Sequence, residues 1–352
     1  MNRLEGYIDL RSDTLTLPTK EMIDAISYAE LGDDVKKEDK STNKLEEYAA
    51  ELLGKEAALF VTSGTMGNLI SILTHTPFRK PEIIAEAHSH ILTSEGSGYS
   101  HVAGVGVKEI EGNKGIINPD DIESNIGYLK NPHHARTALI CMENTHNSAG
   151  GTVASLENME SIRNIADKYN IPMHLDGARI FNAAVALNVK AKEIAKYFDS
   201  VQFCLSKGLS APFGSLIVGS KEFIYEANHM RKMLGGGMRQ SGVMASAGYV
   251  ALTTMRDRLA EDHENAKIIG EGIYDIEGIT LDLDTVQANM IKIDTSKLNV
   301  TAERFAEQLK SNGVLAGPQG KYIVRFVTHR HISREDSLKV VKLVLDTVKQ
   351  LH

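Results

Sequence analysis

Val201-Gln202-Phe203-Cys204-Leu205-Ser206-Lys207-Gly208-Leu209 joins a short apolar run to a lysine and a glycine. The apolar run predicts a buried strand. An ammonium group at the end of such a strand is costly to desolvate unless it is paired or reaches water. Lys207 is chemically reasonable at this position if it forms an imine with a carbonyl group. A lysine that simply extends to the surface is the alternative.

Two other segments place polar groups at the end of a predicted strand. In Met173-His174-Leu175-Asp176-Gly177-Ala178-Arg179, an apolar run ends at Asp176 and turns at Gly177. Ligands of open α/β sheets bind beyond the carboxyl ends of the strands, so this carboxylate is well placed for a cofactor. A helix cap is the simpler interpretation.

The segment Ser63-Gly64-Thr65-Met66-Gly67-Asn68 follows the predicted strand 57–61 and precedes a helical stretch. The N-terminus of a helix offers unpaired N–H groups and a positive dipole end, which favour a phosphate. Gly64 allows close approach of the backbone, and Ser63 and Thr65 add hydroxyl groups. The segment lacks the Gly-Lys-Ser/Thr ending of a Walker loop, and an ordinary N-cap is the alternative.

Together, these three segments indicate a pyridoxal-phosphate site, with a phosphate cradle, an acid for the ring nitrogen and a lysine for an imine. His90 follows the predicted strand 83–86, so its imidazole could stack on a pyridine ring at the same sheet edge. A loop histidine is the alternative. The glycine run 235–237 leads to Arg239, and such a run is either a flexible connector or an anion-binding segment.

Short apolar runs alternate with amphipathic stretches, which is typical of an α/β fold with a mostly parallel sheet. Beyond about Asp257 a charged helix leads into a β-α-β-α pattern. We therefore expect residues 1–256 to form a large α/β domain with an N-terminal arm, and residues 257–352 a smaller α+β domain. The predicted strands are 57–61, 83–86, 137–142, 173–176, 201–204, 215–218 and 322–327, and the predicted helices are 20–30, 43–53, 156–169, 221–233, 256–274, 301–312 and one from 333.

Composition excludes several classes of protein. The 352 residues carry 39 Lys+Arg against 46 Asp+Glu, a net charge of −7 with no basic block, which argues against nucleic acid as a partner. No apolar run approaches the roughly 18 residues of a membrane span. An acidic residue near the start interrupts any signal-peptide core. Cys141 and Cys204 lie in apolar runs, so we expect buried free thiols and a cytoplasmic protein.

The histidines do not predict a metal site. His88 with His90, His133 with His134, and His329 with His331 lack a cysteine partner or a His-Glu-x-x-His frame. We therefore expect no metal ion. A metal hydrolase built on these histidines is a rival hypothesis that predicts sensitivity to chelators.

An ordered set of motifs along nearly the whole chain resembles the low-specificity L-threonine aldolases, which belong to the β-eliminating-lyase group of fold-type-I pyridoxal-phosphate enzymes. The motifs are Asp9-Leu10-Arg11-Ser12-Asp13-Thr14, Gly32-Asp33-Asp34-Val35, Gly54-Lys55-Glu56-Ala57-Ala58-Leu59-Phe60, Ser63-Gly64-Thr65-Met66-Gly67-Asn68, Glu143-Asn144-Thr145-His146-Asn147, Asp176-Gly177-Ala178-Arg179-Ile180-Phe181-Asn182, Phe203-Cys204-Leu205-Ser206-Lys207-Gly208-Leu209, the run 233–240 and Val324-Arg325-Phe326-Val327-Thr328-His329.

The resemblance implies cleavage of L-threonine or L-allo-threonine to glycine and acetaldehyde, with pyridoxal 5'-phosphate as cofactor. It implies a homotetramer with active sites at a dimer interface. The catalytic base is expected to be His146 or His90, acting directly or through a water. The implied roles are Lys207 for covalent attachment of the cofactor, Asp176 for its ring nitrogen, His90 for stacking, Ser63, Gly64 and Thr65 for its phosphate, Arg239 for the phosphate of a neighbouring subunit, and Ser12, Arg179 and Arg325 for the substrate carboxylate, with Arg179 also near the cofactor.

The sequence departs from the family pattern at two places. Relatives usually read Val-Tyr-Gly-Glu-Asp-Pro where this chain has Val35-Lys36-Lys37-Glu38-Asp39-Lys40, and often carry a tyrosine at the position of Ser94. The resemblance places both segments near the substrate pocket or a subunit interface. β-Elimination, racemisation or transamination on the same scaffold is the rival reaction class. A non-catalytic binding protein that keeps the fold is a further alternative.

Overall fold

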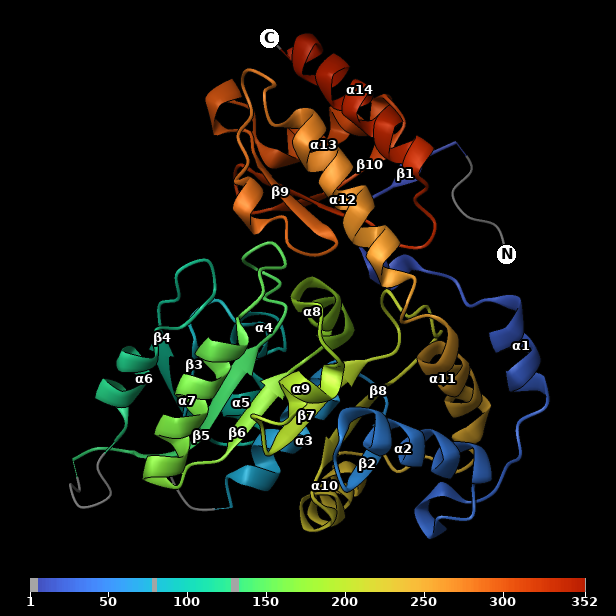
Figure 1. Cartoon of the computed structure of the whole chain (residues 1–352), viewed down its shortest axis with the longest axis vertical. Coiled ribbons are helices and arrows are strands. Elements are labelled where there is room, and N and C mark those ends of the chain that lie inside the picture. Colours follow the sequence, from blue (N-terminus) through green and yellow to red (C-terminus); the bar gives the residue numbers. More distant parts are fainter. Residues whose placement is uncertain (1–5, 78–80, 128–132, 352) are drawn as a thin grey trace.

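A seven-stranded sheet forms the centre of the larger of two bodies in the computed structural model of this chain (Figure 1). The structure describes residues 6–77, 81–127 and 133–351, so the start of the chain, considered above for a signal peptide, lies outside the described residues. The strand order is β2-β8-β7-β6-β5-β3-β4. All neighbours are parallel except β8, which is antiparallel to both β2 and β7. The strands are β2 (Ala57–Val61), β3 (Pro81–Glu86), β4 (Gly106–Ile110), β5 (Arg136–Glu143), β6 (Met173–Asp176), β7 (Ser200–Cys204) and β8 (Ser215–Gly219).

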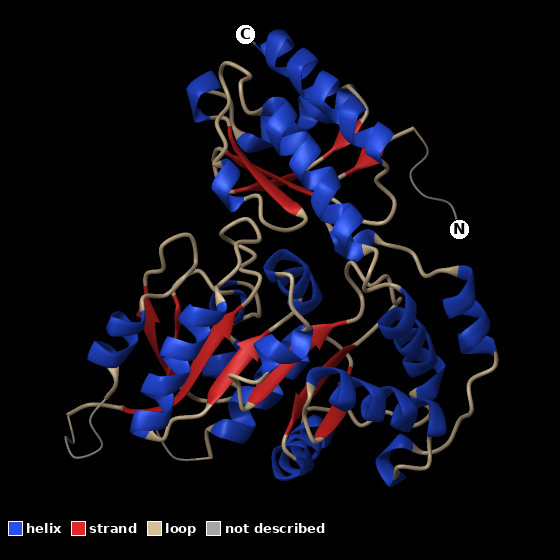
Figure 2. Cartoon of the chain, in the orientation of Figure 1, coloured by secondary structure: helices blue, strands red, loops and turns tan. Residues whose placement is uncertain are grey.

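Helices cover both faces of this sheet (Figure 2). Alternate residues of β2 divide between two apolar clusters, with Phe60 facing one and Leu59 facing the other. Helices α3 and α10 belong to the second cluster, and α2, α7, α8, α9 and α11 to the first. The helices are α1 (Lys20–Ser27), α2 (Lys40–Leu53), α3 (Gly64–His75), α4 (His90–Thr93), α5 (Gly98–His101), α6 (Pro119–Asn125), α7 (Leu156–Tyr169), α8 (Ile180–Leu187), α9 (Ala191–Ala195), α10 (Lys221–Met233), α11 (Gly242–Thr254), α12 (Leu259–Ile273), α13 (Ala302–Ser311) and α14 (Arg334–Leu351).

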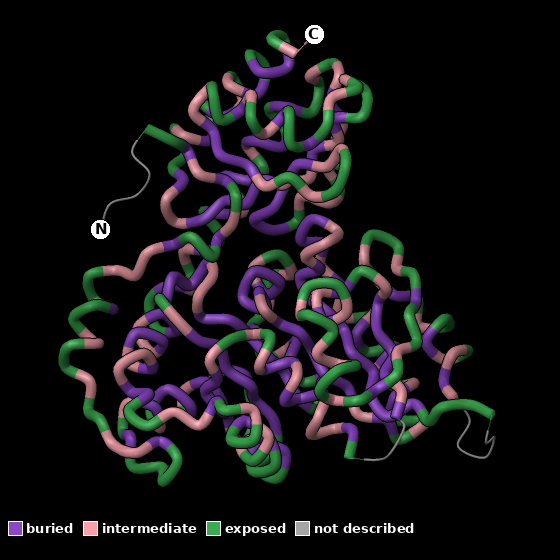
Figure 3. Tube along the Cα trace, turned by 180° about the vertical axis from the view of Figure 1, so that it is seen from behind, coloured by how far each residue is buried: buried purple, intermediate pink, exposed green. Residues whose placement is uncertain are grey.

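The central strands β6 and β7 determine which side chains meet on the α3 face. Met173 and Leu175 of β6 lie in the core on the opposite face. Side chains alternate along a strand, so His174 and Asp176 point to the α3 face. Both strands are buried throughout, and the buried chain runs through the middle of the larger body in Figure 3.

Among the local features that differ from the prediction are the start of α2 and strand β4. Helix α2 begins at Lys40 rather than near Asn43, because the carboxylate of Asp39 caps it by accepting a hydrogen bond from Thr42 N at 2.9 Å. Strand β4 was not predicted. It pairs only with β3 at the sheet edge and exposes most of its residues, so its sequence lacks an apolar run.

The smaller body contains a three-stranded antiparallel sheet of order β11-β12-β9, with α12, α13 and α14 in its apolar core. The first described strand also belongs to this body, since β1 pairs in parallel with β10. The predicted division of the chain at residue 257 stays a prediction. The strands are β1 (Ile8–Asp9), β9 (Met290–Asp294), β10 (Val314–Leu315), β11 (Gly317–Gln319) and β12 (Ile323–Val327).

The described residues contain no helix that combines the length and apolarity needed to cross a membrane. Cys141 and Cys204 are both free and buried, as predicted.

Candidate active site

Asp176 ends β6 at the carboxyl edge of the parallel strands, where the predicted site lies. Its side chain is only 4% exposed. One carboxylate oxygen accepts a hydrogen bond from Asn68 Nδ2 at 2.9 Å, and the other accepts one from Ala178 N at 3.1 Å. The following turn is tight, because a Cβ on Gly177 would stand 2.9 Å from the carbonyl oxygen of Gln202.

Lys207 lies three residues beyond the end of β7, the parallel neighbour of β6. The residue is half-buried, and its carbonyl accepts a hydrogen bond from Thr16 Oγ1 at 2.8 Å. Burial raises the pKa of nearby Asp13, but the charge and hydrogen bonds of Arg179 and the charge of Lys207 outweigh it and hold that pKa well below its usual range. The lysine is therefore close enough to the Asp13–Arg179 pair to interact with it electrostatically.

The loop before α3 contains the residues predicted to bind a phosphate. Ser63 is the N-cap residue, and its Oγ accepts a hydrogen bond from Met66 N at 3.1 Å. Ser63 and Thr65 are exposed. A Cβ on Gly64 would meet Cys204 Sγ at 3.0 Å, so this position suits glycine and brings the helix N-terminus against the end of β7. The capping role of Ser63 and a phosphate-binding role are compatible, because the hydroxyl can still donate its proton.

His90 begins α4 beside Asp176. Its Nδ1 hydrogen-bonds to Glu95 Oε1 at 2.8 Å, and its backbone N donates to Glu143 Oε2 at 2.6 Å. The hydrogen bond to Glu95 and the charges of Asp176, Glu95 and Glu143 outweigh burial and raise the pKa of His90. In the part of the chain that the structure describes, ligand atoms of His90, Glu95 and Asp176 lie within 4.8 Å of one another, a spacing that also suits a metal ion. Hydrogen bonds from Asn68 to both carboxylates already engage this group.

His146 occupies a closed position. It is 1% exposed, its Nε2 hydrogen-bonds to Glu86 Oε2 at 2.9 Å, and its Nδ1 accepts from Ala149 N at 3.3 Å. Burial lowers the pKa of His146, but the bond to Glu86 and the charge of Glu143 outweigh it, so the pKa is raised. Since both ring nitrogens are engaged, the geometry favours His90 over His146 as the proton acceptor.

Arg179 and Arg325 form a basic pair with different partners. Arg179 makes a two-pronged ion pair with Asp13, at 2.8 Å from Nε and 2.7 Å from Nη2, and both side chains are buried. Arg325 donates only from Nη1, to Asn147 Oδ1 at 2.8 Å, while its buried Nε has no hydrogen-bond partner among the described residues. Burial and the charge of Arg179 lower the pKa of Arg325 to about 10. An anion bound beside Arg325 would accept a hydrogen bond from Nε and would balance the repulsion between Arg325 and Arg179.

Ser12 directly precedes Asp13, the ion-pair partner of Arg179, in the sequence. It caps the short turn 13–15, and its Oγ accepts hydrogen bonds from the backbone N and the Oγ1 of Thr14, at 3.2 and 2.8 Å.

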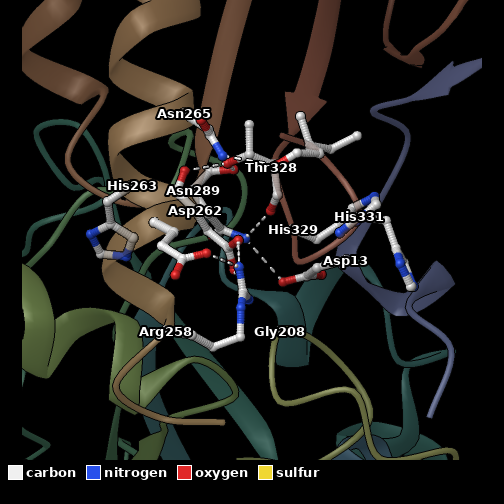
Figure 4. A network of polar contacts seen from close by, with 12 residues as sticks. Asp13, Gly208, Arg258, Asp262, His263, Asn265, Asn289, Thr328, His329 and His331 are labelled. Atoms are coloured by element: carbon white, nitrogen blue, oxygen red, sulfur yellow. Dashed lines mark hydrogen bonds and ion pairs between the residues drawn. The ribbon is translucent and has the colours of Figure 1, made fainter. Parts of the chain in front are cut away.

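A second polar network joins Asp13 to the smaller body (Figure 4). Asn289 Nδ2 donates to Asp13 Oδ2 at 3.2 Å and to the carbonyl of Thr328 at 3.0 Å. Thr328 Oγ1 donates to the carbonyl of Asp262 on α12, whose carboxylate pairs with Arg258 at 2.6 and 3.0 Å. Burial raises the pKa of Asp262 to about 6 against the effect of Arg258. These contacts fix the end of β12, which carries Arg325, to the loop that carries Asp13.

Arg239 lies apart from this group. Its guanidinium, 60% exposed, pairs with Asp33 at 2.9 Å, and its carbonyl accepts from Asp34 N. Among the contacts of the described residues, Arg239 contacts Asp33 and Asp34 rather than Asp176 or Lys207.

The two departures from the family pattern have clear structural positions. Lys37 Nζ pairs with the buried Glu46 of α2 at 2.8 Å. Ser94 is exposed and immediately precedes Glu95, the partner of His90.

Among the described residues, the other histidines belong to no group of three or more possible metal ligands. His88 is exposed near Glu111, at 3.6 Å. His329 hydrogen-bonds through Nε2 to the carbonyl of Asp9, and His331 Nε2 accepts from Leu17 N.

Sequence reasoning missed several residues that hold the site together. Glu143 lies directly beside Asp176, because the two are register partners on β5 and β6. Asn68 and Glu95 surround Asp176 and His90, and Asn147 holds Arg325. Two signals were available: Asn68 closes the glycine motif at the start of α3, and Glu143 directly follows the predicted strand 137–142 of the same sheet.

Comparison with known proteins shows which family this chain belongs to. The family model described as β-eliminating lyase matches residues 9–296. The chain belongs to the β-eliminating lyase family. This membership confirms the predicted lyase class and the resemblance on which it was based.

Named proteins of this family match nearly the whole chain. The chain is 43% identical to low-specificity L-threonine aldolase 1 of Arabidopsis thaliana over 94% of this chain and 93% of that protein. It is 40% identical to the low specificity L-threonine aldolase of Escherichia coli (strain K12) over 95% of this chain and 97% of that protein. A solved structure of Leishmania major threonine aldolase matches with a TM-score of 0.82 at 20% identity, covering 97% of this chain and 99% of that one. The predicted fold class is thereby confirmed.

Proposed function

We propose that this lyase is a pyridoxal-phosphate-dependent aldolase that cleaves L-threonine and L-allo-threonine to glycine and acetaldehyde. The observation that carries the proposal is the position of Asp176 at the end of β6 and of Lys207 just beyond the end of its parallel neighbour β7, in a chain 43% identical to a named L-threonine aldolase. An acid and an amine at one sheet edge suit the two ends of a pyridine aldehyde.

The described residues fit pyridoxal phosphate. A Cβ on Gly64 would crowd Cys204, so glycine lets the N-terminus of α3, with its unpaired N–H groups, lie at the sheet edge where a phosphate would bind. Asp176 is buried and accepts hydrogen bonds from two donors, which hold its carboxylate in place for a ring N–H. His90 stands beside Asp176 and presents its ring at the same edge. When bound, the cofactor supplies an aldehyde for the substrate amine and an electron sink for cleavage of the Cα–Cβ bond.

The basic pair would bind the substrate carboxylate. Arg325 offers its unpartnered Nε, and Arg179 adds positive charge while Asp13 fixes its orientation. Charge-assisted hydrogen bonds from Arg325 would fix the rotation of the amino acid and set its Cα–Cβ bond for cleavage. Ser12, half-buried beside Asp13, adds a hydroxyl to this carboxylate site.

His90 is the better candidate for removing the β-hydroxyl proton. Its Nδ1 is held by Glu95, which leaves Nε2 to accept a proton directly or through a water, whereas both nitrogens of His146 are engaged. Because the pKa of His90 is raised, the neutral imidazole that can accept a proton becomes the main form only at a correspondingly higher pH.

Finer features remain part of the proposal. We expect a cytoplasmic homotetramer that produces glycine, with its active sites at a dimer interface. The exposed Arg239 would reach the phosphate in a neighbouring subunit. Light scattering of the purified protein measures the oligomer, and Arg239→Ala is expected to weaken cofactor binding.

A product assay tests the reaction. The protein is mixed with pyridoxal phosphate and, separately, with L-threonine or L-allo-threonine, and glycine and acetaldehyde are quantified. Equal amounts of the two products support the aldolase, and the rates with the two substrates give the stereochemical preference. Ammonia with a 2-oxo acid, or an inverted amino acid, would instead assign another reaction of this scaffold.

A further inference from the structure

Asn68 is linked by hydrogen bonds to the two residues expected to contact the cofactor ring, directly to Asp176 and through Glu95 to His90. Its Nδ2 donates to Asp176 Oδ2 and to Glu95 Oε1, each at 2.9 Å, and Glu95 in turn holds His90 Nδ1. Asn68 is 1% exposed. One buried amide therefore positions both the acid for the ring nitrogen and the histidine for the ring face.

A chain of hydrogen bonds continues from Asn68 into the interior. Asn68 Oδ1 contacts His174 Nε2 at 3.1 Å, His174 Nδ1 contacts Ser200 Oγ at 2.8 Å, and Ser200 Oγ contacts His75 Nε2 at 2.8 Å. His174 and Ser200 are register partners on β6 and β7. Asn68 and His75 are seven residues apart on α3, so they share one face of that helix.

Donor and acceptor chemistry fixes the direction of every bond. Carboxylates only accept, so the Asn68 amide nitrogen must face Asp176 and Glu95, and its oxygen must face His174. His174 Nε2 therefore carries a proton. A neutral imidazole has one donor and one acceptor, so His174 Nδ1 accepts the Ser200 hydroxyl proton, and Ser200 Oγ accepts from His75 Nε2.

The environment keeps both imidazoles neutral. His174 is fully buried, and burial together with neighbouring His75 lowers its pKa to about 3. Burial lowers the pKa of His75 to about 4, and its ring stacks on Phe223 with centroids 4.6 Å apart. All donors in the chain therefore point from His75 toward the carboxylates, an arrangement in which successive bonds polarise one another.

We propose that Asn68 is a positioning residue, and that the His75–Ser200–His174 chain holds its amide in the orientation that the two carboxylates require, which strengthens the pairing of Asp176 with a protonated ring nitrogen of the cofactor. Donors to the carboxylate favour the pair of charged Asp176 and protonated ring nitrogen over the neutral pair. Loss of the chain leaves the amide oxygen of Asn68 without its fixed donor, so the amide would hold Asp176 and Glu95 less firmly. The proposal rests on the proposed function for the identity of the cofactor.

Ser200→Ala is the most direct test, because it removes one hydroxyl from the middle of the chain. The protein is loaded with pyridoxal phosphate labelled with ¹⁵N in the ring, and the nitrogen chemical shift reports ring protonation. We expect the variant to shift this signal toward the unprotonated position and to lower kcat on the order of tenfold. KM for threonine should stay near the wild-type value, and Ser200→Thr should restore the signal.

Ser71→Ala is the matched control. Ser71 is equally buried on α3, but its hydroxyl donates only to the helix carbonyl of Gly67 at 2.9 Å. It should leave both the nitrogen signal and kcat unchanged. A Ser200→Ala protein with the wild-type signal overturns the positioning role. If Ser200→Ala does not fold, Asn68→Ala is measured in the same way, and a wild-type signal there overturns the proposal equally.

The wild-type protein separates this inference from the proposed function. Wild-type protein that binds the labelled cofactor but forms no glycine overturns the aldolase proposal alone, since ring protonation is still measured. Wild-type protein that binds no cofactor overturns both.

Discussion

The site has two edges of opposite charge. The acidic edge consists of Asp176, Glu95 and Glu143, and the basic edge of Arg179 and Arg325. Burial and the charge of Asp176 raise the pKa of Glu143, whereas burial and the charge of Arg179 lower the pKa of Arg325. Each edge therefore carries a net charge that the neighbouring side chains do not fully balance. A positively charged ring would complete the acidic edge, and a carboxylate would complete the basic one.

The two edges also differ in how completely their polar groups are paired. On the acidic edge, Asp176 accepts two hydrogen bonds and Glu143 accepts two from backbone N–H groups. On the basic edge, Arg325 keeps a buried Nε without a partner in the described structure. Complete pairing fixes the position of a group, whereas a buried unpaired donor indicates where a ligand binds.

Lys207→Ala is expected to have the largest effect on activity, because Lys207 is the proposed site of covalent attachment of the cofactor. We expect glycine release to fall by about 10³-fold or more. Borohydride reduction followed by peptide mass analysis should label Lys207 in the wild type only. Lys190→Ala removes an exposed lysine and is the control. Wild-type turnover in Lys207→Ala would exclude the assigned role.

The basic edge predicts unequal losses of stability when its two arginines are replaced. Arg179→Met leaves the buried Asp13 without its ion pair and is expected to lower the free energy of unfolding by about 3–5 kcal/mol. Arg325→Met removes a poorly paired cation beside Arg179 and should cost much less. Urea unfolding without substrate measures both. Equal losses would contradict the difference in pairing.

The same edge predicts a split in the kinetics. Arg325→Lys keeps a cation but loses the planar fork, so KM for threonine should rise while cofactor binding is retained. A variant with normal KM would remove Arg325 from the carboxylate site.

Asp176→Asn tests the acidic edge. An amide keeps the size of the side chain but cannot balance a protonated ring nitrogen, so we expect kcat to fall roughly 10²-fold. Cofactor absorbance and kcat are measured together. Asp24→Asn, which changes a carboxylate on the exposed surface of α1, controls for the loss of one charge. Unchanged turnover in Asp176→Asn would count against the ring-nitrogen role.

Much of the fold could be predicted because the central strands are buried on both faces. Strands β6 and β7 therefore consist of short apolar runs, and their ends place Asp176 and Lys207 at one edge. The edge strand β4 is mostly exposed and carries no such run. Its existence depends on pairing with β3, which no local pattern encodes.

The partners of the site could not be predicted in the same way. Asn68 and Asp176 are 108 residues apart, and Arg179 and Asp13 are 166 apart. Such contacts depend on how strands and helices pack, and a sequence motif shows only one side of each pair. The family resemblance therefore implied that Arg179 binds the substrate carboxylate, but nothing in the sequence indicated that its guanidinium also makes a two-pronged ion pair with Asp13.

Glu95→Gln is expected to have the smallest effect and tests the acidic edge most finely. The hydrogen bond from His90 Nδ1 to Glu95 is the main cause of the raised pKa of His90. Without that charge, the pKa should fall toward its ordinary value, as an NMR titration of the imidazole would show. Glu111→Gln, beside the exposed His88, should leave the pKa of His90 unchanged.

The change in pKa has a defined effect on stability. Because the folded-state pKa is raised, protonation of His90 stabilises the fold below the unfolded value of 6.5, and this contribution is lost as pH rises through the folded pKa. Glu95→Gln should therefore be less stable than the wild type mainly on the acid side of that range, and the difference should narrow at higher pH. A constant difference across the range would mean that Glu95 acts through packing and its bond to Asn68 rather than through the charge of His90.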